Sequence, residues 1–69
     1  MSRRLPASDP RVVGGTYFSG YWRMEYVVLE MDTVGDLTWF TVGWQDDRIT
    51  THCTAWDPRR DRVISQPSP

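Results

Sequence analysis

Cysteine is almost absent from this sequence: Cys53 is the only one among 69 residues, so no disulfide can form within the chain. Small secreted domains usually contain several cysteines, because disulfides compensate for a core that is too small. No apolar run approaches the length of a membrane span, and no apolar signal-peptide segment follows the N-terminal arginines. We therefore expect a cytoplasmic domain that does not associate with membranes.

Lysine is missing altogether, and the eight basic residues are all arginine. The formal net charge is −1, but the charges are unevenly distributed. Residues 1–24 carry four Arg and one Asp, residues 25–54 carry six acidic residues and one Arg, and residues 55–69 carry three Arg and two Asp. An acidic centre between basic flanks differs from the strongly basic face that is typical of nucleic-acid-binding domains.

A periodic apolar pattern is lacking at both ends of the chain. We predict a flexible N-terminal tail over residues 1–10, one domain over residues 11–65 and a flexible C-terminal tail over residues 66–69. The prolines among the last four residues cannot extend a central strand. A domain of roughly 55 residues buries only about 60% of its unfolded surface, so its stability is expected to be marginal.

Helical periodicity is also missing, whereas alternation with a period of two recurs along the domain. Runs rich in β-branched and aromatic residues predict five strands, over residues 12–18, 26–32, 38–44, 48–54 and 62–65. A long aromatic loop is expected over residues 19–24. Before the last strand, Asp57 and Pro58 predict a tight turn or one turn of 3-10 helix that Asp57 caps.

Two hairpin loops predict how the central strands pair. A two-residue loop at Asp46-Asp47 pairs Trp44 with Ile49, and a four-residue loop over residues 34–37 pairs Met31 with Phe40. Both loops place the same residues of the middle strand on the inner face. The predicted core is Val27, Leu29, Met31, Phe40, Val42, Trp44, Ile49 and Cys53. Tyr26, Trp39 and His52 are expected on the outer face.

The order of these elements resembles that of the SH3-like small barrels, a group that includes Tudor-type domains. Trp39 opens the third predicted strand, Pro58 lies in the turn, and the long loop is aromatic. The resemblance covers residues 11–65. It implies an all-β fold, with a five-stranded antiparallel, strongly twisted sheet or a partly open SH3-like barrel and a 3-10 turn before the last strand. In peptide-binding members these elements form an aromatic groove, which implies ligand-binding residues at Tyr17, Tyr21, Trp22, Trp39 and Pro58.

Catalytic and metal-binding patterns are lacking. His52 and Cys53 are adjacent in a predicted strand, so their side chains leave opposite faces and cannot form a nucleophile pair or chelate one metal ion together. No Gly-rich phosphate loop, nucleophile elbow or dinucleotide fingerprint occurs in the sequence. We therefore expect a protein that is not an enzyme and uses neither a cofactor nor a metal.

Three kinds of partner remain open. The leading hypothesis is a binding module for a peptide or partner protein, with a basic ligand favoured by acidic loop residues such as Asp36. The alternative is a nucleic-acid-binding small barrel, such as an accessory protein of a bacterial chromosome or mobile element. It would contact phosphates through Arg59, Arg60 and Arg62, with Trp56 or Trp22 stacking on a base. The same arginines would otherwise belong to a solvated turn, paired with Asp57 and Asp61. A third hypothesis is a structural homo-oligomer that buries its exposed aromatic residues.

Overall fold

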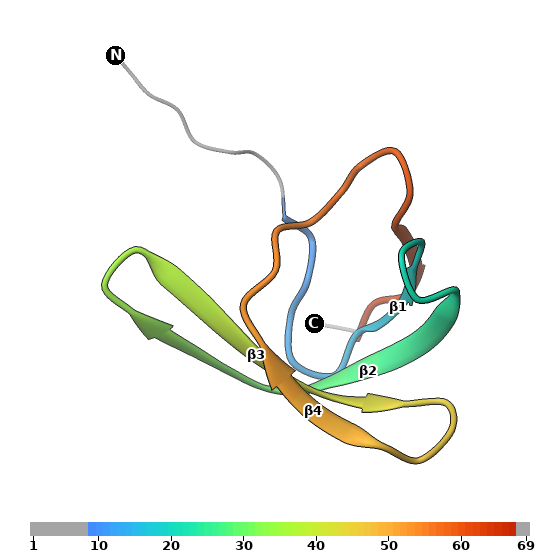
Figure 1. Cartoon of the computed structure of the whole chain (residues 1–69), viewed down its shortest axis with the longest axis horizontal. Coiled ribbons are helices and arrows are strands. Elements are labelled where there is room, and N and C mark those ends of the chain that lie inside the picture. The colour runs from blue at the N-terminus through green and yellow to red at the C-terminus, as the bar shows by residue number, and fades with distance from the viewer. Residues whose placement is uncertain (1–8, 68–69) are drawn as a thin grey trace.

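Five antiparallel strands form one sheet in the computed structural model, which describes residues 9–67 (Figure 1). The strands are β1 (Thr16–Ser19), β2 (Met24–Val34), β3 (Leu37–Trp44), β4 (Ile49–His52) and β5 (Arg62–Ser65). Their order across the sheet is β4-β3-β2-β1-β5, so β4 and β5 are two free edges. The predicted all-β fold is confirmed as an open sheet. The strand order is compatible with an SH3-like architecture.

Helices are absent from residues 9–67, and that part of the chain therefore contains none that could cross a membrane. Most of the two predicted tails, residues 1–8 and 68–69, lies outside the described residues.

The β2–β3 hairpin turns at Gly35-Asp36, two residues instead of the predicted four. Gly35 has a φ of +63°, which glycine adopts without steric cost. Val34 pairs with Leu37 beside the turn, and the predicted pair Met31–Phe40 is confirmed. The shorter loop leaves the register unchanged, because the extra two loop residues pair with each other.

A bulge in β2 then moves the buried face of that strand by one residue. Leu29 is an extra residue without a partner in β3, and Val42 pairs with Val28 instead of Leu29. Side chains alternate along a strand, so a shift of one residue exchanges the two faces. The predicted pairs Leu29–Val42 and Val27–Trp44 are therefore wrong.

The β3–β4 loop is longer than predicted, with a similar effect on β4. Trp44 donates its backbone N–H to the carbonyl of Arg48 at 2.8 Å, which leaves the three residues 45–47 in the loop. Asp47 has a φ of +73°, and a residue with positive φ at the end of a three-residue loop is a common hairpin geometry. The predicted pairs of this hairpin are each displaced by one residue, so that Phe40 pairs with His52 and Gly43 with Ile49.

The core is consequently more aromatic than predicted. Six apolar side chains are buried on one face of the sheet: Tyr17, Tyr26, Val28, Phe40, Val42 and Trp44. Three of them belong to the predicted core, and Tyr26 was expected on the outer face. Of the other predicted core residues Cys53 is half-buried, while the rest are exposed, namely Val27, Leu29, Met31 and Ile49.

The buried hydroxyl of Tyr17 ties both ends of the domain to the sheet. It accepts the backbone N–H of Val12 at 2.9 Å and donates to the side-chain oxygen of Gln66 at 2.7 Å. The amide nitrogen of Gln66 in turn donates to the carbonyl of Pro10 at 3.2 Å. A Cβ at Gly15 would collide with this hydroxyl, so the position requires glycine.

The face assignment of β2 can be tested with two matched valines. Val28 is 1% exposed and Val27 is 37% exposed. We expect Val28→Ala to lower the free energy of unfolding by about 2 kcal/mol, through lost apolar burial and the cavity left behind. Val27→Ala should cost less than about 1 kcal/mol. Urea unfolding of both variants measures this difference, and a larger loss for Val27→Ala would contradict the bulge at Leu29.

Candidate ligand cavity

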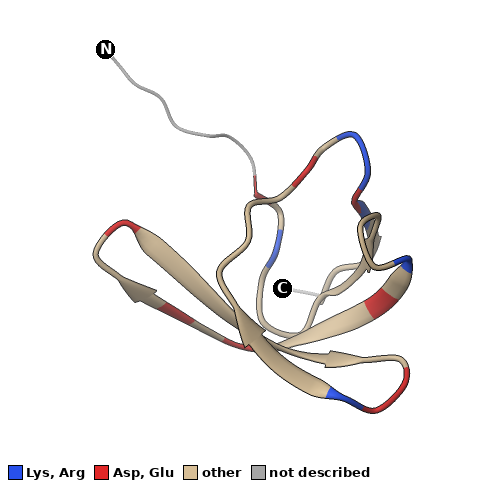
Figure 2. Cartoon of the chain, in the orientation of Figure 1, with Lys and Arg blue, Asp and Glu red and all other residues tan. Residues whose placement is uncertain are grey.

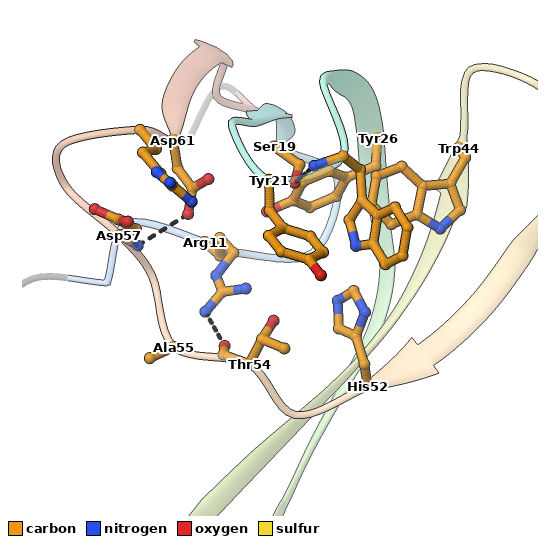
Figure 3. Close-up of a pocket in the computed structure, with 12 residues that line it drawn as sticks. Arg11, Ser19, Tyr21, Tyr26, Trp44, His52, Thr54, Ala55, Asp57 and Asp61 are labelled. Atoms are coloured by element: carbon orange, nitrogen blue, oxygen red, sulfur yellow. Dashed lines mark hydrogen bonds between the residues drawn. The ribbon is translucent and has the colours of Figure 1, made fainter.

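A cavity of about 360 Å³ opens on the buried face of the sheet, between the β1–β2 loop, the end of β4 and the turn before β5 (Figure 3). Its walls combine aromatic rings with a few charged side chains. We call it the aromatic cavity; it is lined by Arg11, Ser19, Tyr21, Trp22, Tyr26, Trp44, His52, Thr54, Ala55, Asp57, Arg60 and Asp61.

Arg11 forms the base of the cavity and is only 4% exposed. Its guanidinium carbon lies 3.9 Å from the ring centre of Phe40, a cation–π distance. Two of its nitrogens bind the carboxylate of Asp9 at 2.9 and 2.6 Å, and one of these also donates to the carbonyl of Thr54 at 2.7 Å. These contacts fasten the segment before β1 to the β4–β5 connection, and Figure 1 shows both on one side of the sheet.

The charge of Arg11 is matched by Asp9. Burial by itself would lower the pKa of Arg11, but the hydrogen bonds and the charge of Asp9 outweigh burial and raise it. Burial would likewise raise the pKa of Asp9, and its bonds to Arg11 lower that pKa instead. The pair therefore stays ionised, and Arg11 remains a cation at the base of the cavity.

Tyr26 and His52 face Arg11 from the sheet. Burial raises the pKa of Tyr26, while the nearby Arg11 partly offsets this effect. Burial lowers the pKa of His52, and the charge of Arg11 lowers it further, so the imidazole is neutral at pH 7. Figure 3 shows Arg11, Tyr21 and His52 directed into the same space. The base of the cavity thus offers hydrogen-bonding groups between aromatic walls.

Trp44 completes the wall behind these residues. Its ring lies 5.1 Å from that of Tyr26 and 6.2 Å from that of His52, measured between ring centres. Its indole nitrogen donates to the hydroxyl of Thr50 at 2.7 Å, which fixes the orientation of the ring.

The mouth of the cavity is held by Asp61. One carboxylate oxygen accepts the backbone N–H of Gly20 at 2.9 Å and the other accepts that of Asp57, also at 2.9 Å. Gly20 lies directly against the backbone of Arg60, where a Cβ would collide. The β1–β2 loop and the turn before β5 are therefore locked together. As predicted, Asp57 caps that turn, accepting the N–H of Arg59 at 2.9 Å.

Two aromatic residues of the β1–β2 loop stand at the mouth. Tyr21 is 71% exposed and Trp22 is 57% exposed. Their rings make an edge-to-face contact with centres 4.9 Å apart. Adjacent exposed aromatic rings held in a tight loop are the kind of anchor that binding sites use. The loop spans only residues 20–23, shorter than predicted, because Ser19 pairs with Met24.

Four arginines lie in or next to the segments that form this mouth, where Asp57 and Asp61 also lie. Arg59 and Arg60 lie in the turn, Arg62 lies at the start of β5, and Arg23 ends the β1–β2 loop (Figure 2). Among the described residues the ion pairs are Arg11–Asp9 and Arg48–Asp46, so these four arginines have no carboxylate partner there. The expected pairing of the turn arginines with Asp57 and Asp61 is wrong, because both carboxylates bind backbone N–H groups instead.

A second groove, of about 620 Å³, lies on the other side of the Arg11–Asp9 pair. It runs between the β2–β3 hairpin and the β4–β5 connection, and Asp9 and Asp36 are the charged groups that line it. Its remaining lining is largely apolar and includes Leu37, Phe40, Cys53, Trp56 and Pro58.

The five predicted ligand-binding residues do not form one surface. Tyr21 and Trp22 line the aromatic cavity, whereas Pro58 lines the second groove. Tyr17 is fully buried, and Trp39 lies on the β2–β3 hairpin, 40% exposed.

The predicted nucleic-acid site contains three arginines, which are neighbours in the sequence, and Trp56, which lies apart from them. Arg60 lines the aromatic cavity, whereas Arg59 and Arg62 are exposed, and Arg62 pairs with Phe18 on the outer face of β1. Trp56 is half-buried, with its ring edge-to-face against Tyr17, and lines the second groove.

Sequence reasoning missed the inner part of the cavity. Tyr26 and His52 were expected on the outer face, and the structure places both on the buried face because of the bulge and the longer loop. Arg11 was expected only as one more basic residue. The acidic residue two positions before Arg11 is the one signal in the sequence, since Asp9 both accepts its backbone N–H and binds its side chain.

Metal ligands do not converge in residues 9–67, where no three side chains of His, Cys, Asp or Glu come together. Comparison of the chain with protein-family models, curated proteins and solved structures finds no match.

The effect of the Arg11 charge on His52 can be tested by titration. We expect the imidazole of His52 to titrate below pH 6.5, and Arg11→Met to raise its pKa by removing a nearby cation. Arg60→Met is the matched control and should leave that pKa unchanged. NMR of the imidazole protons measures the midpoint. Since folding lowers this pKa, the stability that neutral His52 contributes is complete above pH 6.5 and decreases as the pH falls below it. A wild-type midpoint above 6.5 would contradict the burial of His52.

Proposed function

We propose that this chain is a non-enzymatic binding module, and that single-stranded nucleic acid is the ligand that suits the aromatic cavity best. The observation that carries the proposal is the meeting of exposed stacking residues with arginines that have no carboxylate partner among residues 9–67. Proteins that bind single strands combine these two features, because bases stack on aromatic rings while cations follow the backbone.

Arginine suits the proposed backbone contact. Its planar guanidinium binds phosphate through two parallel hydrogen bonds, and it stays charged at any physiological pH. Arg23, Arg59, Arg60 and Arg62 would contact successive phosphates around the mouth, while Tyr21 and Trp22 stack on the bases between them. The cation at the base, Arg11, disfavours a basic side chain inside the cavity and favours a group with hydrogen-bond acceptors, which every base carries.

The acidic remainder of the chain favours a single strand over a duplex. Residues 24–47 contain six carboxylates and no basic residue, so a ligand that covered both ends of the molecule would meet repulsion. A single strand is flexible and can follow one end of the domain. We further propose that the open sheet is a partly open barrel of the SH3-like kind, with the aromatic cavity between its first loop and its last turn.

A peptide or partner protein is the second candidate, favoured by the exposed pair Tyr21 and Trp22. Rigid aromatic residues beside arginine are typical hot spots of protein interfaces. In this case the arginines of the mouth call for an acidic segment, which would replace the basic ligand that the loop carboxylates led us to expect.

Fluorescence anisotropy with labelled single-stranded oligonucleotides tests the proposal. We expect Trp22→Ala to weaken binding by about 1–3 kcal/mol through lost stacking. Arg60→Ala should reduce the slope of log affinity against log salt by about 0.7, the value for one phosphate contact on a single strand.

Arg48→Ala is the matched control, because Arg48 pairs with Asp46 in the β3–β4 loop, outside the cavity lining. It should leave both the affinity and the salt slope unchanged. An equal loss in Arg48→Ala would indicate non-specific attraction. If no oligonucleotide binds at low salt, the nucleic-acid proposal is wrong, and binding of an acidic, aromatic peptide that is lost in Trp22→Ala would support the second candidate.

A further inference from the structure

The outer part of the β2–β3 hairpin, residues 30–39, forms a two-stranded ribbon. The last pair between β1 and β2 is Thr16–Val27, and the last pair between β4 and β3 is His52–Phe40. Beyond these pairs the ribbon has no neighbouring strand in the described part of the chain, and Figure 1 shows it as an arm that extends away from the rest of the sheet. An isolated two-stranded hairpin is only marginally stable in water.

This ribbon has apolar side chains that remain partly exposed in the described part of the chain. Val34 is 61% exposed, Leu37 is 53% exposed, Trp39 is 40% exposed and Met31 is 39% exposed. They lie on a short segment between exposed carboxylates, namely Glu30, Asp32 and Asp36. Val34, Leu37 and Trp39 lie on one face of the ribbon together with Asp32, whereas Met31 lies on the other face. An exposed apolar face with charged neighbours is typical of an interaction site.

The charges of the ribbon and of the cavity mouth are complementary. The ribbon contains three carboxylates and no basic residue, whereas the mouth carries Arg23, Arg59, Arg60 and Arg62 against the two carboxylates of Asp57 and Asp61. Figure 2 shows the acidic residues of the ribbon and the basic residues of the mouth at opposite ends of the molecule. Both ends also expose aromatic rings, with Trp39 on the ribbon and Tyr21 and Trp22 at the mouth.

We propose that the ribbon docks against the cavity mouth of a second copy of this chain. Its carboxylates would pair with the arginines of that copy, and its apolar side chains would pack on Tyr21 and Trp22. Two different surfaces meet in such a contact, so each molecule keeps one free ribbon and one free mouth. The contact is head-to-tail and can extend to short chains. Two ribbons would not pair with each other, because their carboxylates would repel.

The mass of the protein in solution tests this contact without any other ligand, so the result is independent of oligonucleotide binding. We expect sedimentation velocity at low salt to show an average mass that rises with concentration above the monomer mass of 8.1 kDa. High salt should return the protein to monomers, because it screens exposed ion pairs. A monomer at every concentration in low salt would overturn the proposal.

Two variants, each with charges removed from one surface, test whether the contact is head-to-tail. Asp32→Asn with Asp36→Asn weakens the ribbon, and Arg59→Gln with Arg60→Gln weakens the mouth. Each variant alone should remain monomeric, since every contact then loses at least half of the charges on one of its two sides. An equal mixture should form dimers and nothing larger, because the intact ribbon of one variant meets the intact mouth of the other.

Other outcomes contradict the head-to-tail contact. Self-association of the mouth variant alone would show that ribbons pair with each other. Self-association of the ribbon variant alone would show that its carboxylates are not needed. A mixture that stays monomeric, while the wild-type protein associates, would also overturn the proposal. Circular dichroism of both variants provides the control for folding.

Discussion

The structure depends on one buried cation, the guanidinium of Arg11. It stacks on Phe40 in the core, binds Asp9 two residues earlier, and donates to the carbonyl of Thr54 in the β4–β5 connection. A buried charge is costly unless it is paired and its hydrogen bonds are satisfied. The sheet is open, and its strands do not close over the core as they would in a barrel. The contacts of Arg11 instead hold the segment before β1 and the β4–β5 connection over the buried face.

The same cation divides the space above the sheet. Arg11 lines the aromatic cavity, whereas its partner Asp9 lines the second groove. The pair thus turns its cation toward the aromatic cavity and its carboxylate toward the second groove, although the pair as a whole is neutral. The arrangement gives a domain of this size two chemically different recesses on one face. The aromatic cavity has the basic rim and the stacking residues, and the second groove has acidic and apolar groups.

Much of this fold could be predicted from the alternation of apolar and polar residues alone. Where the prediction is wrong, the error has a local cause. The residues of β3 were assigned correctly because Phe40, Val42 and Trp44 alternate without interruption. The faces of β2 and β4 were reversed, since each depends on a single residue that alternation does not reveal. One is the bulge at Leu29 and the other is the extra loop residue before Arg48.

The candidate site could be predicted only at its rim for the same reason. Tyr21, Trp22 and Arg60 lie in loops, and the residue types of those loops in the sequence already indicate that the loops are at the surface. Tyr26 and His52 depend on register, and a shift of one residue moves them from solvent to the cavity wall. Arg11 reaches Thr54 across 43 residues of sequence, and no local pattern predicts a contact of that separation.

The central claim is that a ligand enters the cavity between the β1–β2 loop and the turn before β5. Its most direct test is NMR of the protein with a short single-stranded oligonucleotide, in search of contacts between the protons of the bases and specific side chains. We predict base contacts to the rings of Tyr21, Trp22 and His52, and none to the ring of Trp39. Contacts confined to Trp39 and the β2–β3 hairpin, with the cavity residues unaffected, would contradict it.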